Sequence, residues 1–376
     1  MLWDGSGTIE AAPMQGGRAT PASVAARPDG GNGTVTAPIR VPRRRAEAEP
    51  EHTAWTGGPL PRRLFLGAAA GLAAGPALAA YPERPLVMLH GFAPGGSADT
   101  LARVLSAPLG GLLGQPVLIE PRPGAGGMVA AGALNRAAAD GYTIGLMTGG
   151  HAVGAAFGRN LAFDPVAGFT WVARVVEYGF VVAVRADNPA RDLAALLRLA
   201  ATPAGLSFGS AGSGSTHHLA GELLGAMTGA RLLHVPYRGE ADAITALMAG
   251  DLACAIITTV TAGPHVRDGR LRAIALTAPE PSASFPGVPP VGRTVPGYAV
   301  TTWAGLAGPA SLPAPAVAAL HKAVLSLAEQ PALRARLAEL VDGQVRTSSP
   351  EELRDLVAGE IARWRQLVVS RQLQPD

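Results

Sequence analysis

Two stretches of this chain decide its fold: residues 91–103, GFAPGGSADTLAR, and residues 206–224, LSFGSAGSGSTHHLAGELL. In each, a loop of Gly and Ser leads into a helical pattern of apolar residues. Glycine allows a tight turn that points N–H groups into one cavity, and the helix dipole adds about half a positive charge there. The loops at 92–99 and 210–216 therefore predict carboxylate or phosphate binding without Lys or Arg. Each loop alone is also compatible with a plain tight turn.

The residues around these loops alternate between short apolar segments and amphipathic ones. The predicted strands are 86–89, 116–120, 143–147, 175–184, 206–209, 234–237, 253–259, 271–277 and 302–307. The predicted helices are 97–109, an Ala-rich one after 127, 193–199, 218–227, 241–249, 315–328, 332–340 and 350–369. Such alternation indicates an α/β fold with parallel strands.

Composition and charge exclude several function classes. Of the 376 residues, 48% are hydrophobic and 16% charged, which is typical of a folded protein with a large core. Residues 1–80 account for two of the three net positive charges, so the remainder is almost neutral and a nucleic-acid groove is not expected. The single Cys254 excludes internal disulfides and CxxC motifs. Neither loop matches GxGxxG or a Walker motif, which disfavours nucleotides.

The N-terminal 80 residues have a different pattern. Residues 1–60 are rich in Gly, Ala and Pro and predict a disordered extension, or one added by a misassigned start codon. Residues 61–80, PRRLFLGAAAGLAAGPALAA, show the order of an export signal: an Arg pair, an apolar run and closing small residues. The pair Arg62-Arg63 is compatible with twin-arginine or Sec export, and a buried Ala-rich helix is the alternative.

Motifs along the rest of the chain resemble one family. They are YPERP at 81–85, GFAPGGSADTLAR at 91–103, LGQPVLIEPRPGAGGMVAAGAL at 113–134, AADGYTIGLMTGGHAVG at 138–154, LAFDPVAGF at 161–169, LSFGSAGSGSTHHLAGELL at 206–224, HVPYRGEADAITALMAGDL at 234–252, GPHVRDGRLRAIALT at 263–277 and PGYAVTTWAGLAGPA at 296–310. Together they resemble the substrate-binding proteins of tripartite tricarboxylate transporters, the Bug family of periplasmic receptors.

The resemblance implies a type II periplasmic binding protein, with two α/β lobes that close on a ligand in the cleft between them. The first lobe would comprise residues 82–184 and 302–376, and the second residues 185–301. It further implies a small organic carboxylate as ligand, a membrane permease as partner, a periplasmic location, and neither cofactor nor enzymatic activity. A monomer is expected. Dicarboxylates, tricarboxylates and aromatic acids all stay open as ligands.

By motif, the resemblance assigns ligand contacts to four segments. From the first loop they are Phe92, Ala93, Gly95, Gly96, Ser97 and Asp99. From the neighbouring loop they are Thr148, Gly149 and His151. From the second loop they are Ser210, Ala211, Gly212, Ser213, Gly214, Ser215, Thr216 and His217, and Tyr237 follows in the HVPYRG turn.

Two departures from the family pattern affect the expected ligand. His90-Gly91 stand where the family usually has Val-Pro. The residues 257–259, Ile-Thr-Thr, lack the acid that amino-group ligands use in some members, which favours a plain carboxylate. His90, His151 and His217 are either partners for a second carboxylate or plain loop histidines.

The sequence also offers two rival functions. Gly205-Leu206-Ser207-Phe208-Gly209 fits GxSxG, so an α/β-hydrolase esterase with Ser207 as nucleophile is the alternative. The segment before Ser207 is poor strand material, however, and Ser207 itself is predicted inside a strand. A metal site at His217, His218 and His234 lacks a carboxylate partner at helical spacing, and no metal is expected.

Overall fold

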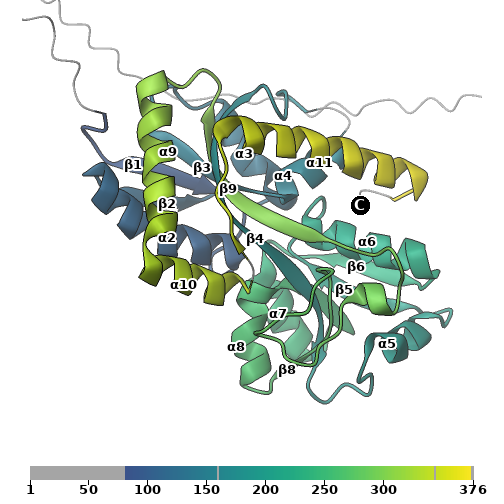
Figure 1. Cartoon of the computed structure of the whole chain (residues 1–376). Coiled ribbons are helices and arrows are strands. Elements are labelled where there is room, and N and C mark those ends of the chain that lie inside the picture. The colour runs from purple at the N-terminus through teal and green to yellow at the C-terminus, as the bar shows by residue number, and fades with distance from the viewer. Residues whose placement is uncertain (1–80, 159–160, 343, 374–376) are drawn as a thin grey trace, which may run out of the picture. The chain divides into compact units, whose positions relative to one another are not determined.

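The computed structural model describes residues 81–158, 161–342 and 344–373 (Figure 1). The predicted extension at 1–60 and the predicted export signal at 61–80 lie outside these residues. Within the described ranges, no helix is both long and apolar enough to cross a bilayer.

The first half of the fold is built around three parallel strands. These are β1 (Leu86–His90), β2 (Val117–Pro121) and β3 (Thr143–Thr148), and β1 pairs with both of the others. The helices that follow them are α2 (Ser97–Leu113), the short 3-10 turn η2 (Ala125–Gly127), α3 (Met128–Asn135) and α4 (Gly150–Phe157). The C-terminal part of the chain returns to this half with β9 (Thr301–Pro309), α9 (Ala314–Glu329), α10 (Pro331–Val341), β10 (Gln344–Val345) and α11 (Pro350–Ser370).

The second half repeats the alternation of strands and helices. Its strands are β5 (Leu206–Ser210), β6 (Leu232–Pro236), β7 (Cys254–Thr258) and β8 (Leu271–Leu276), and β5 lies parallel to β6 and β7. Its helices are α5 (Leu193–Ala200), α6 (Thr216–Thr228), α7 (Glu240–Ala249), α8 (Thr259–Arg267) and the 3-10 turn η3 (Val291–Arg293). Parallel strands place the loops that follow β5 and β7 at one edge of the sheet.

The long strand β4 (Phe169–Arg185) belongs to both halves. Residues 169–179 pair with β9, and residues 180–185 pair with β7 and β8, all antiparallel (Figure 1). The parallel pairing predicted from the sequence therefore holds within each half and changes to antiparallel at β4 and β9. One buried cluster, including Val172, Leu306 and Leu320, lies mainly in the first half, and another, including Val181, Ile257 and Leu276, lies in the second. A third cluster contains residues of both halves, among them Leu89, Trp303 and Phe208.

Two helices were not predicted from the sequence. In α4 all eight residues are buried, so the segment lacks the polar face that marks an amphipathic helix. The predicted strand 253–259 ends at Thr258, because the Thr258 side chain accepts the N–H of Thr261 and begins α8. The strand β4 also begins at Phe169, six residues before the predicted 175.

Candidate functional site

The first predicted loop joins β1 to α2 and is held by a charged network in its own half. Gly95 has a φ of +83°, and its N–H donates to Asp99 Oδ2 at 3.0 Å. Asp99 also accepts from Arg103 Nε at 2.9 Å and lies 3.4 Å from Nε2 of buried His90. Burial alone would raise the pKa of Asp99, but Arg103 and the Gly95 amide lower it below its usual value. Gly96, the N-cap of α2, provides no side chain to cap the helix.

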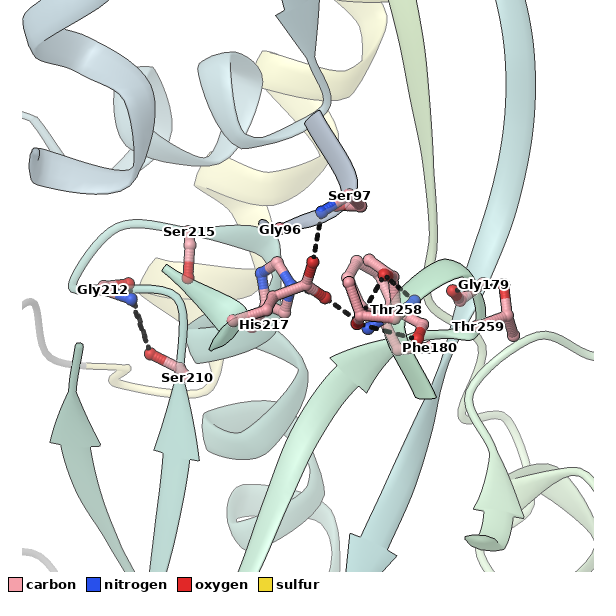
Figure 2. A network of polar contacts seen from close by, with 12 residues as sticks. Gly96, Ser97, Gly179, Phe180, Ser210, Gly212, Ser215, His217, Thr258 and Thr259 are labelled. Atoms are coloured by element: carbon pink, nitrogen blue, oxygen red, sulfur yellow. Dashed lines mark hydrogen bonds and ion pairs between the residues drawn. The ribbon is translucent and has the colours of Figure 1, made fainter. Parts of the chain in front are cut away.

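The second predicted loop joins β5 to α6 and is closed by its own side chains. Gly212, with a φ of +111°, donates its N–H to Ser210 Oγ at 3.0 Å (Figure 2). Ser215 is the N-cap of α6, and its Oγ accepts the N–H of His218 at 3.2 Å. Gly214 donates to His218 Nδ1 at 3.2 Å. The start of α6 is therefore satisfied locally.

The two loops touch each other across the halves. The N–H of Ala93 donates to the carbonyl of Arg238 at 3.2 Å, and Phe92 packs with Ala211 in a small apolar cluster. Gly126, from η2, lies so close to the second loop that a Cβ there would stand 2.5 Å from a backbone carbon of Gly214. Only glycine allows the backbones to approach this closely.

Between the loops lies a carboxylate that the sequence reasoning did not assign, that of Glu240. This residue is 2% exposed and begins α7. Its Oε2 accepts a hydrogen bond from the N–H of Ser97 at 2.8 Å. Its Oε1 accepts a hydrogen bond from the N–H of Thr258 at 2.5 Å and another from Nε2 of His217 at 3.0 Å. In Figure 2 one dashed line leaves the labelled Ser97 and another ends beside the labelled Thr258. Glu240 thus joins the start of α2 in the first half to the starts of α6 and α8 in the second.

The contacts of Glu240 keep its carboxyl group ionised. Burial alone would raise its pKa, but the hydrogen bond and charge of His217 and the amides of Thr258 and Ser97 lower that pKa to about 2. Ser97, which the family resemblance assigned to the ligand, therefore has its amide engaged by an internal anion. The sequence analysis found no acidic residue at 257–259. Glu240 nevertheless places a carboxylate beside the predicted ligand residues Ser97 and His217. In the sequence, Glu240 is visible only as an acidic residue in the first turn of the helix that follows HVPYRG. That position does not show that its side chain contacts Ser97, which is 143 residues away.

A small cavity of about 10 Å³ lies beside this carboxylate, with room for about one water molecule. Its polar lining is Ser97, Thr148, Tyr178, Thr216, His217, Thr258 and Thr302. Two of these polar atoms, Thr216 Oγ1 and His217 Nδ1, are buried and have no hydrogen-bond partner among the described residues. The ring of His217 is flanked by Phe180 and Phe92, with ring centroids at 4.7 Å and 6.4 Å.

The fold agrees with a comparison with known proteins. The model of the tripartite tricarboxylate transporter family receptor matches residues 101–373. The chain belongs to this family. The family that the motifs indicated is thereby confirmed, and so is the two-lobed α/β fold of a periplasmic binding protein.

Three relatives show how far the similarity of this receptor extends. BugT of Bordetella pertussis is 32% identical over 305 residues, which cover 80% of this chain and 93% of BugT. The structure of MatC from Rhodopseudomonas palustris with bound malate is 33% identical, with a TM-score of 0.72 over 77% of this chain and 100% of MatC. The structure of R. palustris Rpa4515 with adipate is 29% identical, with a TM-score of 0.75 over 79% and 100% of the two chains.

The receptor brings five of the predicted ligand residues together at this cavity. Phe92, Ser97, Thr148, Thr216 and His217 line it directly. The other predicted positions do not line it. Ala93, Gly95, Gly96 and Gly149 lie in loops, Asp99 lies in the first turn of α2, and residues 210–215 run from the end of β5 to the start of α6. Many of the loop amides have partners inside the chain.

Three predicted histidine and tyrosine positions lie elsewhere. His151 is in α4 rather than in a loop, and its Nε2 bonds the carbonyl of Pro165 at 2.7 Å among Phe and Trp rings. Burial lowers the pKa of His151 to about 4. Tyr237 packs on the core of the second half. His90 lies behind the first loop, against Asp99.

The two rival interpretations find no matching geometry. Ser207 lies inside β5, where its Oγ accepts the N–H of Ala253 at 3.1 Å, so it is not at a strand-to-helix turn as a hydrolase nucleophile would be. The adjacent histidines face different neighbours: His217 bonds Glu240, whereas His218 stacks on His234 with ring centroids 4.0 Å apart.

Proposed function

We propose that this receptor captures a small organic carboxylate between its two halves and presents it to a tripartite tricarboxylate-type permease. The observation that carries the proposal is the meeting of two strand-to-helix loops, one from each half, around a cavity with two unpartnered polar atoms. Helix N-termini and hydroxyl groups at such a place favour an anion. Relatives with bound malate and adipate support a carboxylate as the ligand class.

Capture requires the two halves to move. The cavity holds about one water molecule, so an acid of four to six carbons enters only when the loops separate. The two-lobed fold provides that motion, with the strands β4 and β9 as the connections that bend. We propose residues 82–184 with 302–376 as the first lobe and residues 185–301 as the second.

The contact groups we propose for the ligand are Ser97, Thr148, Thr216 and His217, which line the cavity. Gly95 and Gly212 would act by shaping the loops, since both have positive φ. His151 and Tyr237 are left out, because their side chains have structural partners away from the cavity. We also propose export to the periplasm through the segment 61–80 and action as a monomer.

A thermal-shift screen tests the proposal. The purified protein is heated with malate, adipate, citrate, aromatic acids and amino acids, each next to its amide. A ligand at a hundred times its dissociation constant stabilises the fold by about 2.7 kcal/mol, which raises the melting temperature by several degrees. We expect a shift with an acid and none with its amide, because the amide leaves buried donors unpaired. Equal shifts for acid and amide, or none for any compound, would refute carboxylate capture.

A further inference from the structure

The side chain of Glu240 is bound by the rest of the protein as a free carboxylate would be. Its Oε2 accepts a hydrogen bond from the N–H of Ser97, and its Oε1 accepts hydrogen bonds from the N–H of Thr258 and from Nε2 of His217. These donors lie at the starts of α2, α8 and α6, and helix starts are places where proteins bind anions. Here the anion belongs to the chain itself, on the first residue of α7.

The backbone around Glu240 fits closely on the first loop. The N–H of Ala93 donates to the carbonyl of Arg238 at 3.2 Å. A Cβ on Gly239 would stand 3.1 Å from the Cβ of Ala93, and a Cβ on Gly96 would stand 3.6 Å from Glu240 Oε2. The segment 238–240 therefore carries its carboxylate to the start of α2 as a tethered group.

The three contacts of this carboxylate divide unequally between the halves. Thr258 and His217 lie in the second half together with Glu240, whereas Ser97 lies in the first. When the halves separate, Oε1 keeps both of its partners and Oε2 loses its one partner. The carboxylate then stays in position on the second half, and the bond to Ser97 is the contact that opening breaks.

Ser97 is also one of the contact groups proposed for the ligand, since it lines the cavity. A backbone N–H offers a single hydrogen, so it makes one full hydrogen bond at a time. Two carboxylates close to the same N–H also repel each other, because both are negatively charged. A ligand carboxylate therefore gains the Ser97 N–H only when Glu240 Oε2 releases it.

We propose that Glu240 is a specificity-determining residue, a tethered carboxylate that competes with the ligand for the N–H of Ser97. This inference rests on the proposed function and adds which acids the site accepts. A tethered group competes as if it were present at about millimolar concentration or more. Acetate, which has only a carboxylate to offer, does not displace it. An acid with a second polar end also reaches groups such as Thr216 Oγ1, so it can.

The variant Glu240→Gln tests the competition, with binding measured by isothermal titration calorimetry. The amide oxygen can replace Oε1, and the amide nitrogen then faces the Ser97 N–H, from which it cannot accept. We expect the dissociation constants for malate and adipate to fall about tenfold, because one hydrogen bond to a charged group no longer has to be broken. Asp242→Ala removes an exposed acid from the same helical turn and is the matched control. It should bind as the unmodified protein does.

The variant Glu240→Ala tests the same place with a free anion. The atoms removed beyond Cβ correspond to those of acetate, so sodium acetate can fill the place of the lost carboxylate. We expect acetate to raise the melting temperature of Glu240→Ala by several degrees more than that of Asp242→Ala, with sodium chloride at equal ionic strength as the reference. Acetamide has one oxygen in place of two and should not produce this difference. Glu240→Gln, in which the place stays filled, should not respond to acetate.

The outcomes separate this inference from the proposed function. If Glu240→Gln binds malate and adipate no more tightly than Asp242→Ala does, the competition is overturned and carboxylate capture remains. Acetate that binds the unmodified protein as tightly as malate does overturns the selection, and this titration decides even where a Glu240 variant does not fold. A protein that binds no acid in any of these forms overturns carboxylate capture, and this inference with it.

Discussion

The two loops of this receptor look alike in sequence and are stabilised in different ways. The second loop is satisfied by its neighbours in the chain, since Ser210 holds Gly212 and Ser215 caps α6. The first loop ends at a helix whose N-cap is Gly96, and the Ser97 N–H is bonded instead by Glu240, 143 residues away. One loop can therefore form within its own segment, whereas the other reaches its final state only when the two halves meet.

The largest effect is expected where a side chain would distort the second loop. In Gly212→Leu the φ of +111° is unfavourable for leucine, and a Cβ would stand 3.0 Å from the carbonyl oxygen of Tyr237. Acid-induced thermal shifts should disappear, while the far-UV circular dichroism spectrum stays that of a folded protein. Gly111→Ala, where a Cβ meets nothing within 4 Å, is the matched control and should bind normally. Unchanged affinity in Gly212→Leu would contradict the two-loop site.

Removing the long-range carboxylate should be the most costly change for stability. Glu240→Ala leaves two backbone N–H groups and the His217 ring without their buried acceptor. We expect a loss of about 3–5 kcal/mol in the free energy of unfolding, measured with urea. The exposed Glu339→Ala should change it by less than about 0.5 kcal/mol. Equal losses in the two variants would show that Glu240 does not hold the halves together.

Lowering the pH from 4.5 towards 2 should weaken the hydrogen bonds of the Glu240 carboxylate. Because the pKa of Glu240 falls from 4.5 to about 2 on folding, its ionised form stabilises the fold fully above pH 4.5, and this stabilisation is lost as the pH falls towards 2. The difference in unfolding free energy between the unmodified protein and Glu240→Gln should therefore shrink over that range. Burial raises the pKa of Glu360 to about 7, so this residue also makes stability depend on pH. Its contribution is the same in both proteins and cancels when their unfolding free energies are subtracted. A difference that stays constant down to pH 2.5 would argue against an ionised Glu240.

The smallest effect is expected at the local cap of the second loop. Ser215→Ala removes the acceptor of the His218 N–H and should destabilise the protein by about 1 kcal/mol. Ser106→Ala, within α2, removes a hydroxyl that makes no cap and should be close to neutral. If Ser215→Ala cost as much as Glu240→Ala, the contrast between a local and a long-range loop would not hold.

Much of this architecture was predictable from the sequence because it rests on short-range patterns. Apolar runs of four to six residues gave strands close to their observed bounds, and Gly and Ser between strand and helix marked both loops. The position of Ser207 inside a strand, which argues against a hydrolase, could be predicted from the residues next to it in the chain. In contrast, α4 was missed because all its residues are buried and no polar face gives a helical period.

The sequence by itself determined the family, the α/β alternation and the two loops, because each depends on residues that are adjacent in the chain. Only the tertiary structure decided which side chains reach the cavity. In the folded chain the His151 side chain bonds the carbonyl of Pro165. The Glu240 carboxylate contacts Ser97, which belongs to the opposite half. A buried carboxylate needs several donors at once, and here these donors lie at the starts of three helices that are far apart in the sequence: Ser97 and His217 in α2 and α6, and Thr258 as the N-cap of α8.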